Sequence, residues 1–167
     1  MELRIAGTAN DSIVDGPGIR FTIFTQGCPH RCEGCHNPQT HDFNGGEIVD
    51  TDELLQKIRS NPLLDGVTFS GGEPFCQAQA LALLGGEIKK LGLNVVTYTG
   101  YEFEQLYENR DKNGWEELLE VTDFLIDGRF EQSKRDWKIR FRGSSNQRYL
   151  DCKASLGSGH PVETEPQ

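Results

Sequence analysis

Two hydrophobic periodicities alternate along the chain. Apolar and β-branched residues dominate residues 19–26, 66–70, 93–99 and 124–126, which predicts four strands. Between and around them, apolar residues recur every three to four positions over residues 50–60, 77–91, 102–108 and 115–121, which predicts four helices. Asp50 is placed as the N-cap of the first helix, and Asn61 followed by Pro62 ends that helix.

The order of these elements predicts the fold class. Strands joined by helical crossovers build an α/β fold with a mostly parallel sheet. About four strand–helix units are too few for a closed eight-stranded barrel, so we expect a partial, open (βα) barrel in a single domain. We expect this domain over residues 1–152 and a disordered tail over residues 153–167, because the tail is rich in Ser, Gly, Pro and Glu.

The residues that follow the four predicted strands are candidates for the functional site, because chemistry in parallel α/β folds gathers at the carboxyl ends of the strands. These residues are Gly27–Cys28, Gly71–Glu73, Gly100–Tyr101 and Asp127–Arg129. We expect the four loops to meet around one site.

Charge and hydropathy limit the classes of partner that the protein is expected to bind. The 167 residues include 17 Lys and Arg against 26 Asp and Glu, a formal net charge of −9. An acidic chain of this kind is not expected to bind nucleic acid or an anionic membrane. We find neither the roughly 20 apolar residues of a membrane span nor a signal peptide. The expectation is therefore a cytoplasmic protein, whose thiols stay reduced.

Cys28, Cys32 and Cys35 lie within eight residues, directly after a predicted strand. Thiolates crowded in this way select zinc, copper(I) or iron–sulfur clusters. A structural zinc site takes four ligands, usually as two pairs, and the sequence has no second CxxC pair. Ferredoxin clusters use four cysteines, whereas three leave one iron open to substrate. The pattern favours a cluster that performs chemistry; the alternative is a non-catalytic zinc or electron-transfer module.

The CxxxCxxC spacing resembles the signature of the radical S-adenosylmethionine enzymes, in which three cysteines hold a [4Fe–4S] cluster and the cofactor chelates the fourth iron. Residues 70–74, SGGEP, follow a predicted strand and resemble a second motif of that family. The resemblance implies that the backbone of this motif and Glu73 bind the amino group of the cofactor. The residues implied to contact the cofactor are Gly34, Cys35, His36, Gly71, Gly72 and Glu73.

Other segments narrow the resemblance to the glycyl-radical-enzyme activases. DGPGIR at residues 15–20 and CHNP at residues 35–38 are typical of these activases. YTGY at 98–101, IDGRF at 126–130 and RGSSNQR at 142–148 are similar to the branch that serves the anaerobic ribonucleoside-triphosphate reductase. The resemblance implies an oxidoreductase that receives one electron from flavodoxin or ferredoxin. It would cleave S-adenosylmethionine to a 5′-deoxyadenosyl radical, which abstracts hydrogen from a glycine of the large reductase subunit.

The resemblance also suggests roles for residues outside the two motifs. Asp127 and Arg129 are candidate cofactor contacts, with an ordinary salt bridge as the alternative. Arg142, Asn146 and Arg148 are candidates for docking the reductase, with a polar turn as the alternative.

The sequence does not assign the roles of three further residues or the identity of the target. Tyr98 stands about where related activases carry an aspartate, which puts a cation site there in doubt, and Cys76 and Cys152 have no assigned role. Two alternatives keep the radical chemistry and change the target, to another glycyl radical enzyme or to a small molecule, as in deazapurine synthesis.

Overall fold

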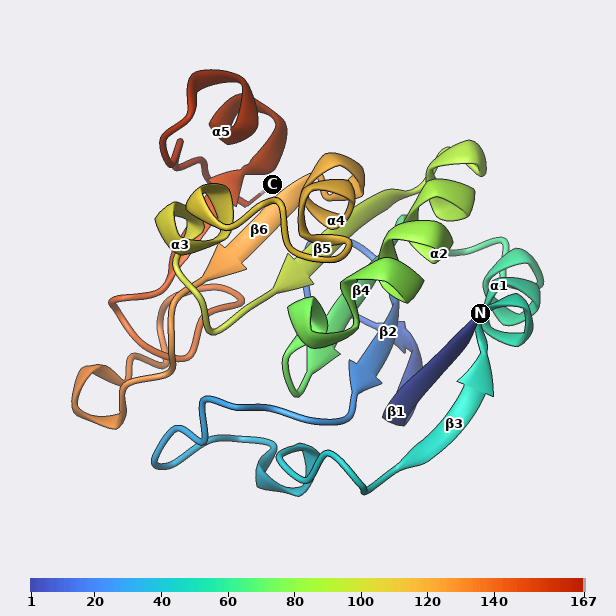
Figure 1. Cartoon of the computed structure of the whole chain (residues 1–167), viewed down its shortest axis with the longest axis horizontal. Coiled ribbons are helices and arrows are strands. Elements are labelled where there is room, and N and C mark those ends of the chain that lie inside the picture. The colour runs from blue at the N-terminus through green and yellow to red at the C-terminus, as the bar shows by residue number, and fades with distance from the viewer. Residues whose placement is uncertain (167) are drawn as a thin grey trace.

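The computed structural model describes residues 1–166 and consists of one seven-stranded sheet with helices packed on it (Figure 1). The order of the strands across the sheet is β3-β1-β2-β4-β5-β6-β7. The strands are β1 (Glu2–Ser12), β2 (Arg20–Thr25), β3 (Glu47–Asp50), β4 (Gly66–Gly71), β5 (Asn94–Tyr98), β6 (Phe124–Asp127) and β7 (Arg148–Asp151). The α-helices are α1 (Thr51–Arg59), α2 (Ala78–Lys90), α3 (Phe103–Glu108), α4 (Trp115–Val121) and α5 (Cys152–Ser158).

Parallel pairing is confined to the centre of the sheet. β2, β4, β5 and β6 pair in parallel, whereas β1 runs antiparallel to both β2 and β3, and β7 runs antiparallel to β6. The predicted single-domain α/β class is therefore confirmed. The predicted partial barrel is not confirmed, because the sheet is mixed and does not close, and β3 and β7 are its outer strands.

The four strands and four helices predicted from periodicity are confirmed to within one residue at each end. β1, β3, β7 and α5 were not predicted. α5 extends from Cys152 to Ser158, into residues 153–167, where the sequence suggested a disordered tail, and Leu150 pairs with Glu163 beyond it. The last residue of that tail, Gln167, lies outside the described residues.

The sheet has one apolar and one partly polar face. α1, α2, α4 and α5 pack side by side over the apolar face, where Ile23, Phe69 and Val95 enter the main core. The opposite face carries Arg20, whose guanidinium is completely buried and donates to Thr68 Oγ1 and to several backbone carbonyls. Burial lowers the pKa of Arg20 to about 10.

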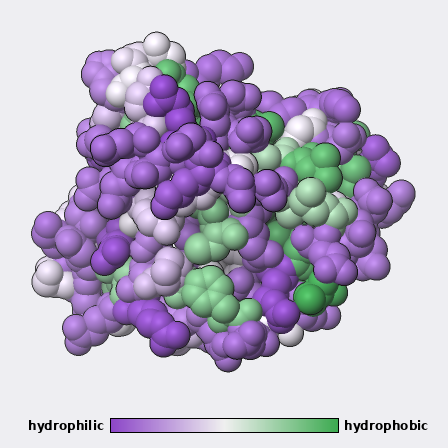
Figure 2. All heavy atoms as spheres, viewed as in Figure 1, coloured by the Kyte–Doolittle hydropathy of each residue, from purple (hydrophilic) through white to green (hydrophobic). Residues whose placement is uncertain are grey.

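The outer surface in the view of Figure 2 is mainly hydrophilic, in line with the acidic composition, and apolar atoms gather towards the side of α1 and α2. No helix within residues 1–166 has the length and apolar character needed to cross a bilayer.

Candidate functional site

The carboxyl ends of the four parallel strands meet at one edge of the sheet, as the sequence predicts. Glu73 N donates to Gly27 O at 2.8 Å, which joins the loops after β4 and β2. Gly100 N donates to Glu73 Oε1 at 2.7 Å, which adds the loop after β5. Gly128 N donates to Tyr101 O at 2.9 Å, which adds the loop after β6. Hydrogen bonds thus connect the four loops in the order of their strands.

Glycines allow the loops after β2 and β4 to touch. Gly27 and Gly71 have φ angles of 106° and 91°, a region that favours glycine. A Cβ on Gly72 would lie 2.4 Å from Gly27 O, so no side chain fits there. The GGE segment therefore lies directly against the residue that precedes Cys28.

The cysteine loop, residues 28–35, leaves the end of β2 and turns back on itself. Cys28 is buried and the other two cysteines are half-buried. Arg31 and Gly34 take left-handed φ angles of 49° and 73°, and Cys35 N donates to Cys32 O at 3.2 Å. These turns bring three thiols from a short segment to the same edge of the sheet as the GGE segment.

The surroundings of the three sulfurs fit an iron–sulfur cluster. Burial raises the pKa of the Cys28 and Cys32 thiols, and backbone N–H groups oppose this shift at both. Asn37 N lies 3.5 Å from Cys35 Sγ. N–H donors to sulfur are a common feature of iron–sulfur sites. Within residues 1–166 no three His, Cys, Asp or Glu side chains form a single-ion site.

Glu73 is completely buried, and its carboxylate already has protein partners on both oxygens. Oε1 accepts from Gly100 N and from Thr99 Oγ1 at 2.9 Å, and lies 2.6 Å from His30 Nε2. Oε2 accepts from Phe75 N, at the start of a short 3₁₀ helix over Pro74–Gln77. The side chain implied to bind the cofactor therefore points into the protein.

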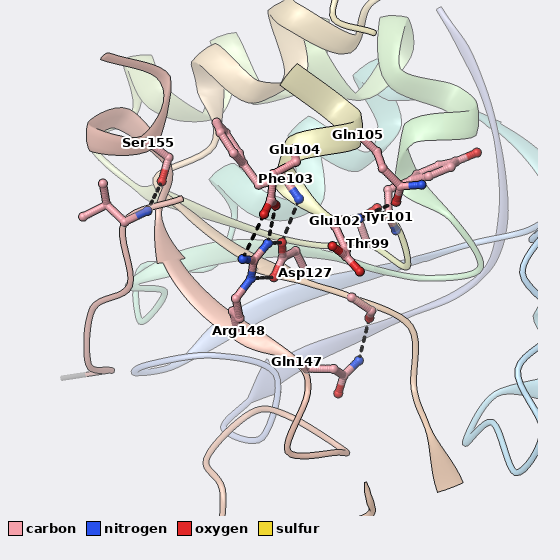
Figure 3. Close-up of polar contacts among 12 residues, drawn as sticks. Thr99, Tyr101, Glu102, Phe103, Glu104, Gln105, Asp127, Gln147, Arg148 and Ser155 are labelled. Atoms are coloured by element: carbon pink, nitrogen blue, oxygen red, sulfur yellow. Dashed lines mark hydrogen bonds and ion pairs between the residues drawn. The ribbon is translucent and has the colours of Figure 1, made fainter. Parts of the chain in front are cut away.

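Asp127 is also buried and takes part in an ion-pair network (Figure 3). It accepts from Phe103 N at 2.7 Å and from Arg148, which also pairs with Glu104 at 2.6 Å. The hydrogen bonds that Arg148 donates to Asp127 raise the pKa of Arg148, and those that it donates to Glu104 lower the pKa of Glu104. The geometry is that of the salt bridge named as the alternative, and it engages the guanidinium of Arg148 within the protein.

The segment from Arg129 to Gln147 lies beside the cysteine loop. Asn146 Nδ2 donates to Arg129 O, and Arg142 Nε donates to Arg140 O, so both contacts are to backbone. The Arg129 side chain is exposed, and its charge lowers the pKa of Cys32, against the larger effect of burial. Arg135 Nη2 reaches Gly34 O at 3.4 Å.

An aromatic surface borders the cysteine loop. His36 packs against Phe130 and stacks on Trp137, with ring centroids 5.1 and 6.3 Å apart, and Trp137 is 79% exposed. A hollow of about 500 Å³ opens next to it, lined by Glu33 of the loop and by residues 130–134. Space for a small molecule therefore lies against the cysteine loop.

Three residues left open by the sequence have ordinary structural surroundings. Tyr98 Oη donates to Phe141 O at 2.7 Å, and burial raises the pKa of Tyr98. Cys152 is completely buried, and burial raises the pKa of its thiol to about 12. Cys76 is exposed.

His30 was not predicted as a site residue, although it lies between two of the cysteines. Its ring is buried against Glu73, and its centroid is 4.6 Å from that of Tyr101. No local signal in the sequence distinguishes such an inward histidine from a surface histidine, because its partners come from distant parts of the chain.

The parallel strands and the cysteine loop at their ends define an iron–sulfur protein of the α/β class. Residues 14–150 match the family described as a 4Fe-4S single cluster domain. The chain therefore belongs to this family.

Two kinds of activating protein are similar to this chain. It is 33% identical over 144 residues to the anaerobic ribonucleoside-triphosphate reductase-activating protein of Pasteurella multocida, covering 81% of this chain and 89% of the relative. It is 29% identical to the protein of the same name from Escherichia coli K12, with 81% and 90% covered. It is 38% identical over 129 residues to the pyruvate formate-lyase-activating enzyme of Clostridium pasteurianum, covering 74% of this chain. The match spans about half of that enzyme, 50%.

These findings confirm the resemblance stated from the sequence. The chain is a radical S-adenosylmethionine enzyme of the activase type, and its cofactors are a [4Fe–4S] cluster and S-adenosylmethionine.

Proposed function

We propose that the protein activates the anaerobic ribonucleoside-triphosphate reductase by producing a glycyl radical in its large subunit. The observation that carries the proposal is the contact between the cysteine loop and the GGE segment at the ends of β2 and β4, in a chain that aligns with nine tenths of the reductase-activating proteins. When bound, the cluster and S-adenosylmethionine supply one-electron cleavage of the cofactor to a 5′-deoxyadenosyl radical.

We assign the side chains of the loop as follows. Cys28, Cys32 and Cys35 would each hold one iron and leave the fourth iron to the cofactor. The cofactor would lie along the same edge of the sheet, against Gly34, Cys35 and His36 and against the GGE segment. Because the Glu73 side chain is fully engaged, we assign the amino group of the cofactor to the backbone of Gly71–Glu73. Holding the cofactor near the target glycine is the main task of the protein.

We propose the segment Arg129–Arg148 as the docking site for the reductase. Arg142 and Asn146 are partly accessible and lie in a segment that contacts the cysteine loop. Arg148 and Asp127 would support this surface through their ion pair rather than bind the partner directly. Arg129, exposed and close to Cys32, is the residue of this group best placed to meet the cofactor.

A flavodoxin or ferredoxin would supply the electron, in the cytoplasm, where such donors operate. Charge supports an acidic donor of this kind. Residues 134–142 contain Lys134, Arg135, Lys138, Arg140 and Arg142 against one acid, Asp136, in a chain of net charge −9. This basic strip adjoins the cysteine loop through Arg135, so an acidic donor docked there would bring its redox centre close to the cluster.

The decisive experiment uses anaerobically purified protein with its cluster, S-adenosylmethionine, a reductant and the large reductase subunit. We expect a glycyl-radical signal by electron paramagnetic resonance, together with 5′-deoxyadenosine. A colourless protein with one zinc, or a brown protein that never cleaves the cofactor, would contradict the proposal and support the non-catalytic module.

The 38% identity to a pyruvate formate-lyase-activating enzyme favours a second candidate target, pyruvate formate-lyase. Parallel reactions with each glycyl radical enzyme separate the two targets. We expect the radical on the reductase; a radical on pyruvate formate-lyase alone would assign the chain to the second target.

A further inference from the structure

We infer that His30 is a positioning residue: it fixes the cysteine loop to the sheet edge through Glu73, whose carboxylate serves the loop and not the amino group of the cofactor. The inference deepens the proposed function, and it relies on that function only where cofactor binding is measured.

The orientation of His30 is unusual for this loop. Pro29, Arg31, Glu33 and Gly34 are exposed, as expected for a surface segment. The His30 side chain, in contrast, is only 4% exposed, and its Nε2 lies 2.6 Å from Oε1 of the completely buried Glu73. Both Glu73 oxygens accept from backbone N–H groups, so we assign Nε2–H as the donor in this contact.

The Glu73 carboxylate has no acceptor site to spare. Four donors lie 3.0 Å or less from its two oxygens: His30 Nε2, Thr99 Oγ1, Gly100 N and Phe75 N. A carboxylate offers about four lone-pair sites. A bound ammonium group would therefore have to displace one of these donors from a fully buried position, at the cost of leaving that donor unpaired.

The loop after β5 is shaped to receive the imidazole ring. A Cβ on Gly100 would lie 2.4 Å from His30 Cδ2, so the ring occupies the space that only a glycine leaves free. Tyr101 also makes an edge contact with the ring, at an interplanar angle of 78°. This enclosure is independent of the hydrogen bond, and it shows that His30 has one defined position.

Few other contacts hold the loop. Gly27 N and Cys28 N donate to Thr40 O and His41 O at its start, and Arg135 reaches Gly34 O at 3.4 Å. Within residues 1–166, His30 is the one residue of 29–36 whose side chain hydrogen-bonds to a completely buried group. Loss of this bond would release the loop between Cys28 and Cys32 and spread the sulfurs apart.

Tryptic cleavage after Arg31 measures this release without using the cluster chemistry. The full chain is digested before and after cluster reconstitution, in wild type, His30→Leu, His30→Gln and Glu73→Gln. We expect His30→Leu and Glu73→Gln to speed cleavage after Arg31 at least tenfold before reconstitution, and His30→Gln, which keeps a donor, to restore much of the protection. His160→Leu, which changes an exposed histidine after α5, should leave the rate unchanged. Cleavage after Arg59 should stay at the wild-type rate in every variant.

Cofactor binding to reconstituted protein separates positioning from direct contact. If Glu73 acts on the loop, the Kd for S-adenosylmethionine rises by similar factors in His30→Leu and Glu73→Gln. The double variant should then have a Kd no higher than that of the single variant that binds more weakly. The inference is overturned if Glu73→Gln raises the Kd tenfold or more while His30→Leu changes neither Kd nor cleavage. If His30→Leu loses the wild-type circular dichroism, His30→Asn takes its place, because the shorter side chain cannot reach Glu73. Unchanged protection against cleavage after Arg31 in His30→Asn would equally overturn the inference. If wild type never cleaves the cofactor, the proposed function fails, and the tryptic rates still decide the role of His30.

Discussion

At the scale of single residues, the five cysteines divide by their surroundings. Cys28, Cys32 and Cys35 share one loop at the sheet edge, next to peptide N–H groups. Cys152 lies in the core, and Cys76 is exposed after the GGE segment. Since a thiol binds iron as the thiolate, cluster assembly must release a proton from thiols whose pKa burial has raised. Loading of the loop should therefore depend strongly on all three ligands.

Cys32→Ser should abolish the cluster and cofactor cleavage while leaving the fold intact, because its loop lies outside the core. Iron analysis should fall from roughly four irons per chain in wild type to a small residue, with unchanged circular dichroism. Cys76→Ser serves as the matched control and should keep its iron. Full cofactor cleavage by Cys32→Ser would refute the ligand assignment.

Cys152 should resist alkylation in the folded protein. Burial raises the pKa of this thiol to about 12, and its sulfur donates to Leu119 O at 3.3 Å, so both thiolate and access are lacking. Iodoacetamide at pH 8 should label Cys76 in the native chain because this thiol is exposed, but slowly, since desolvation raises its pKa to about 11. It should reach Cys152 only after unfolding in urea. Mass spectrometry of tryptic peptides measures both; rapid native labelling of Cys152 would show that α5 opens from the sheet.

At the scale of secondary-structure elements, Arg148 joins three of them. It lies at the start of β7, and it binds Asp127 at the end of β6 and Glu104 in α3 (Figure 3). Asp127 in turn accepts from the first amide of α3. This network holds the outer strand and the short helix beside the loop after β6.

Arg148→Met should lower the free energy of unfolding by about 2–3 kcal/mol, because it leaves a buried carboxylate without its cation. The loss is smaller than for a fully buried pair, since Arg148 is 24% exposed. Arg142→Met removes a guanidinium that contacts only a backbone carbonyl, so it should change the free energy of unfolding by less than about 0.5 kcal/mol. Urea denaturation at pH 7 measures both; equal losses in the two variants would contradict the assignment.

The contribution of Glu104 to this network should depend on pH. Arg148 lowers its pKa in the folded state, so its stabilising effect is present above the ordinary glutamate pKa of about 4.3. The effect is lost as the pH falls through the lower folded pKa. The stability difference between wild type and Glu104→Gln, well under about 1 kcal/mol for an exposed pair, should therefore vanish in acid. A difference that persists below pH 3 would argue against the ion pair.

Local periodicity was sufficient to predict eight of the elements and failed for β1, β3, β7 and α5. β2, β4, β5 and β6 are buried strands with near-continuous apolar residues, and α2 has a clear apolar stripe. β1 contains Gly7 and a polar second half, and β7 has only two apolar residues between Arg148 and Asp151, so pairing with neighbouring strands determines both. The cysteine and GGE motifs could likewise be recognised in the sequence. The partners of His30 and Glu73 could not, because they depend on how loops distant in the chain meet.

At the scale of the whole molecule, charge is distributed unevenly. Residues 134–142, the basic strip, carry five cations and one anion, and the other residues carry 12 cations and 25 anions. The strip lies next to the cysteine loop, with Arg135 stacked on Phe130 and Trp137. In Figure 1 the segment after β6 extends towards the same side of the molecule as the loop after β2. The acidic donor proposed above would therefore meet local attraction at the basic strip, against a general repulsion between two acidic proteins.

This asymmetry predicts how an acidic donor protein reduces the cluster. Lys138 and Arg140 are exposed and form no ion pair within residues 1–166, so Lys138→Glu with Arg140→Glu should alter the field and leave the fold unchanged. Reduction by an acidic flavodoxin should slow at least tenfold at low salt, and the usual decrease in rate with added salt should disappear, because steering acts over about 10 Å at 0.1 M ionic strength. Reduction by dithionite, which needs no docking, should proceed at rates close to wild type. Charge reversal of Lys57 and Arg59 in the last turn of α1, which are likewise exposed and form no ion pair within the described residues, provides the matched control away from the cysteine loop. Equal slowing in both double variants would mean that net charge alone governs the encounter, and the basic strip would then have no special role in docking the donor.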